Sequence, residues 1–152
     1  MGTSVYANLS YGIYIDYTEL PWSDDKYDDI EDWWLDVNNF TNPIECPYTE
    51  DGNYKEGFYS GHPLINKYFE NIKNFHKENT IPIKIVYDGD YDSPVHILTT
   101  KTMFAYWGEL QDVDPDFFND IQESHNKLID FLEKYGIITD QEPRWILSSY
   151  MP

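Results

Sequence analysis

Seven carboxylates between residues 24 and 36 have the types and spacing best suited to binding a cationic partner. They are Asp25, Asp29, Asp32 and Asp36, at i, i+4, i+7 and i+11, and Asp24, Asp28 and Glu31 in a neighbouring row. On a helix, such side chains lie roughly 5–6 Å apart and repel one another. Little local lysine relieves this repulsion, so the arrangement costs stability and must be either tolerated or used.

Two interpretations of this acidic row are open. A line of regularly spaced negative charges resembles a nucleic-acid backbone to a protein built to grip phosphates, which predicts a DNA mimic or another interface for a basic partner. The alternative is a solvated helix face, whose repulsion is offset by the helix dipole and by tryptophan packing. The net charge of the whole chain, -18, favours the first interpretation.

Three tryptophans, Trp22, Trp33 and Trp34, lie close to the acidic run. Neighbouring residues of a helix point about 100° apart, so Trp33 and Trp34 are not readily both fully buried. A partly exposed tryptophan ringed by carboxylates would anchor Arg or Lys by cation–π contact and ion pairing. The alternative is that both are core residues. With the seven carboxylates, the three tryptophans form the candidate binding site.

We expect no metal, no cofactor and no catalytic residue. The histidines have neither HxxxH nor HxH spacing, and the single cysteine, Cys46, lacks the usual partners for zinc. Asp88, Asp90 and Asp92 resemble the opening of a calcium loop, but the glycine is misplaced and a turn with exposed aspartates is sufficient. Close carboxylate pairs are inevitable among 28 acids, so such a pair does not indicate a general acid and base.

The composition indicates one folded domain, 1–152, with acidic ends. The chain has 28 Asp and Glu against 10 Lys and Arg, and it includes 14 tyrosines, far from the aromatic-poor composition of disordered acidic chains. The excess of acids is concentrated before residue 61 and after residue 108. Nucleic acid is therefore a poor direct partner, because a binder must neutralise phosphates with Lys and Arg.

The termini and hydropathy predict a cytoplasmic protein without a membrane partner. Residues 1–17 have neither a basic region nor an uninterrupted apolar region of the kind that begins a secretory signal. No stretch approaches the ~20 apolar residues that span a bilayer. If the chain is encoded by a phage, the expected location is the cytoplasm of the host cell.

The hydrophobic pattern predicts α+β structure. Strands are expected at about 6–17, 81–87, 95–107 and 145–150, and helices at about 23–37, 62–79 and 114–136. The Asp88-Gly89 step joins the two middle strands as a hairpin. The order β-α-α-β-β-α-β favours a mostly antiparallel sheet of about four strands covered by about three helices. Residues 38–61 form a long irregular connection.

Part of the N-terminal sequence resembles small acidic accessory proteins encoded by tailed bacteriophages. The resemblance rests on Tyr11-Gly12-Ile13-Tyr14-Ile15, then Leu20-Pro21-Trp22, then Asp29-Ile30-Glu31-Asp32-Trp33-Trp34, about a quarter of the chain. Proteins of this kind include inhibitors of host restriction, CRISPR and other defence systems, several of them acidic DNA mimics. The resemblance implies an inhibitor, but it assigns no target and no functional residue.

Charge and resemblance together predict a non-enzymatic binding protein that occupies the basic nucleic-acid-binding surface of a host protein. One alternative is an immunity-type inhibitor of a basic nuclease toxin. Another is a small enzyme that acts on a nucleotide-like signal, with a pocket between residues 38–61 and the sheet; a pocket that gathered Lys67, Lys73, Lys84, Lys101 and Arg144 would favour it. A third is that the acidity only maintains solubility. The oligomeric state stays open.

Overall fold

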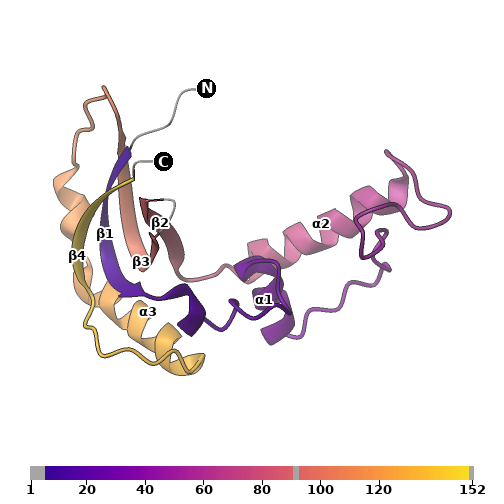
Figure 1. Cartoon of the computed structure of the whole chain (residues 1–152), viewed down its shortest axis with the longest axis horizontal. Coiled ribbons are helices and arrows are strands. Elements are labelled where there is room, and N and C mark those ends of the chain that lie inside the picture. Colours follow the sequence, from indigo (N-terminus) through magenta and orange to yellow (C-terminus); the bar gives the residue numbers. More distant parts are fainter. Residues whose placement is uncertain (1–5, 91–92, 151–152) are drawn as a thin grey trace. The chain divides into compact units, whose positions relative to one another are not determined.

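The computed structural model describes residues 6–90 and 93–150, and the chain divides into two compact units. The first unit comprises residues 1–29 and 82–152 and contains the sheet and α3 (Ile121–Lys134). The second comprises residues 30–81 and contains α1 (Ile30–Val37) and α2 (Pro63–Glu78). Figure 1 shows these elements along the chain. Within the described residues, no helix is long and apolar enough to cross a membrane.

Four strands form the sheet of the first unit, and they confirm the predicted fold class. They are β1 (Tyr6–Ile15), β2 (Lys84–Asp90), β3 (Ser93–Tyr106) and β4 (Arg144–Tyr150). In the order β4-β1-β3-β2, neighbouring strands are antiparallel, and a single parallel bridge joins Gly89 to Tyr150. With the three α-helices, the predicted order β-α-α-β-β-α-β is confirmed. The predicted hairpin is β2–β3; its residues 91–92, and with them Asp92, lie outside the described residues.

A bulge interrupts the pairing of β1 with β3. Tyr11 is paired with Lys101 and Gly12 with Thr99, so Thr100 is the extra residue. The Thr99 hydroxyl stabilises the bulge, since its Oγ1 lies 2.7 Å from Tyr11 O and 2.6 Å from Lys101 O. The two backbones approach so closely that a Cβ on Gly12 would lie 2.0 Å from Leu98 O. Glycine is therefore required at this point of β1.

The two faces of the sheet bury different side chains. On one, the Ile97 face, Ile97 packs with Val86 and Ile146, and Tyr14 and Phe104 lie against them. The opposite face, which includes Ile13 and Leu98 and which we call the Leu98 face, lies against α3. Thr100 Oγ1 donates a hydrogen bond to Ser124 O at 3.2 Å, and Tyr11 Oη and His125 Nδ1 are hydrogen-bonded at 3.1 Å. The buried side of α3 carries Leu128, Phe131 and Leu132.

The predicted helix at 114–136 is divided into two. A short 3-10 helix, η2 (Pro115–Phe118), precedes α3, and Asp120 between them has a left-handed backbone with φ of 58°. Lys101 explains the break, because its Nζ donates hydrogen bonds to the carbonyl oxygens of Phe117 and Asn119. In a continuous helix, these carbonyl oxygens would accept from backbone N–H groups of the helix itself. A single helix at this place is therefore wrong.

The predicted helix at 23–37 is also too long. Only Ile30–Val37 is helical, whereas residues 21–29 form turns and bends. Ser23, at the start of the predicted range, does not cap a helix but donates its Oγ to Leu20 O at 2.7 Å. The aspartates that follow have low helix propensity and repel one another, so nothing offsets the loss of this cap.

The second unit is built on α2. The helix begins as predicted, with His62 Nδ1 accepting from Leu64 N at 3.1 Å and Pro63 in the first turn. Segment 38–62 runs without regular structure beyond a bridge between Tyr48 and Tyr54, and it packs on α2. Asn42 Nδ2 donates to Tyr68 O at 3.0 Å, and the rings of Phe40 and Phe75 are 4.7 Å apart. These contacts anchor the long connection to the helix.

Candidate functional site

All seven carboxylates of the predicted binding site are exposed. They lie, however, in two different structural settings. Asp24, Asp25, Asp28 and Asp29 belong to the turns of the first unit, whereas Glu31, Asp32 and Asp36 lie on α1 in the second unit. The prediction of one continuous helical row is therefore wrong, because the helix begins only at Ile30. Asp32 and Asp36 keep the i, i+4 spacing on one face of α1.

The three tryptophans of the predicted site are buried. Their exposed fractions are 2% for Trp22, 3% for Trp33 and 5% for Trp34. The indole rings of Trp33 and Trp34 lie 6.0 Å apart, and Trp34 Nε1 donates a hydrogen bond to Asn79 O at 2.7 Å. The alternative that both are core residues is confirmed, and a partly exposed tryptophan anchor is wrong. Their contribution is to hold the backbone that carries the carboxylates.

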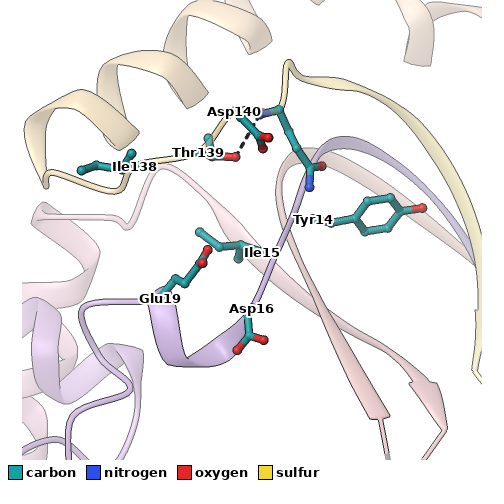
Figure 2. Close-up of a pocket in the computed structure, with 8 residues that line it drawn as sticks. Tyr14, Ile15, Asp16, Glu19, Ile138, Thr139 and Asp140 are labelled. Carbon is teal, nitrogen blue, oxygen red and sulfur yellow. Dashed lines mark hydrogen bonds between the residues drawn. The ribbon is translucent and has the colours of Figure 1, made fainter.

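Two further carboxylates line one cleft beside the end of β1. Glu19 is the last residue of η1 (Tyr17–Glu19), and Asp140 lies in the connection from α3 to β4; both line a cleft with a volume of about 490 Å³. Asp16, Tyr14, Ile138 and Thr139 line it as well. Figure 2 shows that the Glu19 side chain extends toward Ile15, while Asp140 comes from the opposite wall. A cleft of this charge and size suits the head group of an arginine or lysine side chain.

The carboxyl groups of Asp16, Glu45 and Glu123 have lowered pKa values, which favour the ionised form. Hydrogen bonds from Thr18 N at 2.9 Å and Thr18 Oγ1 at 2.8 Å lower the pKa of Asp16. Lys55 Nζ, 2.6 Å from Glu45 Oε1, lowers the pKa of Glu45 by its hydrogen bond and its charge. Lys127 lowers the pKa of Glu123 in the same way. These groups remain anionic well below neutral pH, as binding to cations requires.

The described residues contain no group of three or more His, Cys, Asp and Glu side chains that could hold a metal ion. No Lys or Arg is among the described residues that line the cleft of Glu19 and Asp140. Of the bases whose clustering would favour an enzyme, Lys67 and Lys73 belong to the second unit, and Lys84, Lys101 and Arg144 to the first. Arg144 lies over the Tyr14 ring, 5.3 Å from its centre, and its guanidinium donates to Gln141 Oε1 at 3.2 Å.

Beside the acidic cleft, His96 is buried on β3. It is 5% exposed and lies between the rings of Tyr17 and Tyr87, each 5.0 Å away. Its Nδ1 has no hydrogen-bond partner among the described residues. Burial lowers the pKa of His96, and the nearby charge of Asp16 opposes this only in part. The folded state therefore favours neutral imidazole.

This burial makes one contribution to stability pH-dependent. Above a pH of about 6.5, the ordinary pKa of histidine, the contribution is complete. As the pH falls through this value toward the lowered pKa of the folded state, the unfolded chain takes up the proton first, so stability is lost. We expect the free energy of unfolding of the native chain, minus that of His96→Gln, to be smaller at pH 5 than at pH 7.5 in urea titrations. A difference that stays constant with pH would contradict this assignment.

Comparison of the chain with known proteins finds no matching family model, no matching curated protein and no matching solved structure. The fold and the surfaces therefore define the protein only as an acidic α+β protein with exposed carboxylates.

The sequence did not point to Glu19 or Asp140. They are far apart in the chain, and only the return of β4 alongside β1 brings their segments together. No local spacing links Glu19 to Asp140, so the sequence pattern does not indicate that they line the same cleft. Asp16 was equally inconspicuous, as a single acid at the end of a strand.

Proposed function

We propose that the chain is a non-catalytic binding protein that covers the basic nucleic-acid-binding surface of a partner protein. In line with the N-terminal resemblance, this partner belongs to host restriction, CRISPR or another defence system, and the protein acts as an anionic mimic of DNA in the host cytoplasm. The observation that carries the proposal is the exposure of all seven carboxylates at 24–36 on a chain of net charge -18.

Both units contribute to the anionic field. From the sequence, the first unit has 19 acids and 6 bases, and the second has 9 acids and 4 bases. A field of one sign attracts a basic surface before contact and repels nucleic acid. Since the Debye length is about 8 Å at physiological salt, the attraction acts only near contact and weakens as salt is added.

No carboxyl group among the described residues has a clearly raised pKa. A carboxyl that acts as a general acid near neutral pH needs a raised pKa. The carboxyl groups with clear shifts among the described residues, Asp16, Glu45 and Glu123, have lowered pKa values instead. Permanent negative charge is the property that a phosphate mimic uses.

Capture from a bacterial lysate tests the proposal. The native chain is expected to retain basic proteins at low salt and to release them at moderate salt. A variant with Asp25, Asp29, Asp32 and Asp36 changed to Asn should retain much less, because these exposed charges lie in the proposed contact. Mass spectrometry of the retained proteins provides the measurement.

A matched variant controls for net charge. Changing Glu70, Glu78 and Glu133 to Gln and Asp130 to Asn removes four exposed charges elsewhere, so its capture should resemble that of the native chain. If all three proteins retain the same set equally, residues 25–36 are not the recognition surface. Retention of one basic nuclease toxin, with loss of its activity, would assign the immunity-type alternative. Turnover of a nucleotide would assign the enzyme.

A further inference from the structure

The Leu98 face of the sheet is covered only in part. The helix α3 lies over its central rows, as the contacts of Thr100 and Tyr11 with α3 show. At the row of Tyr11, its partner Trp145 on β4 is covered by η2, whose Phe117 and Phe118 rings lie 5.4 and 5.0 Å from the ring of Trp145. Among the described residues, no helix lies over the sheet beyond η2 toward the start of β1, so the helical cover of the Leu98 face ends at η2.

Beyond η2, the same face continues as an apolar row. Leu9 of β1 is paired with Met103 of β3 on one side and with Leu147 of β4 on the other. Alternation along the strands places these side chains on the face of Tyr11 and Trp145. Together with Ala105 and Val113 they line a groove of about 180 Å³. Leu147 is 76% exposed.

The connection from β3 to η2 contributes Val113 to this groove and exposes two further apolar side chains. Val113 lines the groove itself and is exposed, Leu110 is fully exposed, and Trp107 is 85% exposed. Scattered single apolar side chains are ordinary on a surface, whereas a contiguous patch of them marks an interaction site. Here Val113 and the strand row line one groove.

The rim of this apolar surface is acidic. Glu109, Asp112, Asp114 and Asp116 all lie in the same connection and are exposed. The sequence from 102 to 126 contains no Lys or Arg. The nearest base on the sheet, Lys101, is occupied by the carbonyl oxygens of Phe117 and Asn119. An occupant must therefore offer apolar side chains to the groove and positive charge to its rim.

We propose that this groove is a docking site for a short, cationic, amphipathic segment of a partner protein. Its apolar side chains lie against Leu9, Met103 and Leu147, and its Lys or Arg side chains reach the carboxylates of Glu109 and Asp112. Helical segments with apolar residues at i, i+3, i+4 and i+7 recognise grooves in this manner. The surface is additional to the carboxylates at 24–36.

Charge excludes the competing occupants. A second copy of the chain would bring its own acidic rim against this one, and like charges placed together at an interface disfavour association. An anionic lipid surface would be repelled for the same reason. The charge complementarity of the rim leaves a basic segment as the matching partner.

A designed peptide tests this docking site. The probe is a fluorescently labelled helical peptide of about 14 residues, with Leu on one face and Lys on the other. We expect its fluorescence anisotropy to rise on binding, and Leu147→Ser to weaken the affinity about tenfold. Because Leu147 is largely exposed, this change should leave the fold intact. Glu109→Gln with Asp112→Asn should weaken binding mainly at low salt.

Controls separate this site from the rest of the surface. Leu64→Ser removes an exposed apolar side chain of the second unit and should not change binding. The variant with Asp25, Asp29, Asp32 and Asp36 changed to Asn should also bind normally; loss there would place the peptide on the proposed mimic surface instead. A peptide with Ser in place of Leu that binds equally well would overturn the proposal. So would a dimer of the native chain, seen by light scattering, that Leu147→Ser dissociates.

Discussion

Replacing Gly12 with alanine is expected to destabilise the protein by about 3 kcal/mol or more. The added Cβ would lie 2.0 Å from Leu98 O and 2.9 Å from Leu98 C, and both are backbone atoms. A flexible side chain could move aside at small cost, but here β1 and β3 themselves must separate at the bulge. Separation there would also break the bonds of the Thr99 hydroxyl and uncover Ile13 and Leu98, which are fully buried.

Gly52→Ala is the matched control. Gly52 has φ of 76°, and an added Cβ would meet nothing within 4 Å. This control should lose only the cost of a left-handed residue, about 1–2 kcal/mol. Urea unfolding, followed by circular dichroism, compares the two variants. Equal losses of stability would show that β1 and β3 do not approach as closely at Gly12 as described.

Neutralising the exposed acids at 25–36 is expected to have the largest effect on binding. With Asp25, Asp29, Asp32 and Asp36 changed to Asn, we expect association with a captured basic partner to slow on the order of tenfold at low salt. The carboxylates act mainly by steering the encounter, so dissociation should change less. Stopped-flow or surface-based kinetics measure both rates.

A control variant has the same net charge as this four-acid variant but is neutralised at Glu70, Glu78, Asp130 and Glu133 instead. It separates a local contact from a general field. If both variants slow association equally, the field of the whole chain acts and residues 25–36 have no special part. A larger effect at 25–36 locates the contact there.

Local signals were sufficient to predict much of the fold. The helix expected at about 62–79 is confirmed as α2, with Pro63 in its first turn. The hairpin expected between the two middle strands is confirmed as β2–β3, although Asp88 and Gly89 do not form its turn but lie within β2, paired with Val95 and Pro94. In these places a residue's preference depends on its immediate neighbours, so the sequence contains the information.

Other features depended on side-chain hydrogen bonds that the helical pattern does not reveal. The break after η2 results from Lys101 of β3, whose Nζ donates hydrogen bonds to the carbonyl oxygens of Phe117 and Asn119. The late start of α1 follows from Ser23, whose hydroxyl bonds back to Leu20. Neither bond could be inferred from helical spacing, which fits a continuous helix in both segments.

Only part of the candidate site could be predicted from the sequence. The exposure of the acids at 24–36 follows from their charge, whereas the burial of Trp22, Trp33 and Trp34 depends on packing. The groove at Leu9 and Leu147 could not be predicted from the sequence, since both residues have the pattern of ordinary core positions of strands. They are uncovered only because η2 ends the cover one row earlier.

The most direct test of the proposed function is competition with DNA. With a captured partner and a labelled duplex, the native chain is expected to displace the duplex completely, with an apparent affinity that falls steeply as salt rises. Its four-acid variant should displace it only at higher concentration. A stable ternary complex of partner, duplex and native chain would contradict the claim that this protein occupies the nucleic-acid-binding surface.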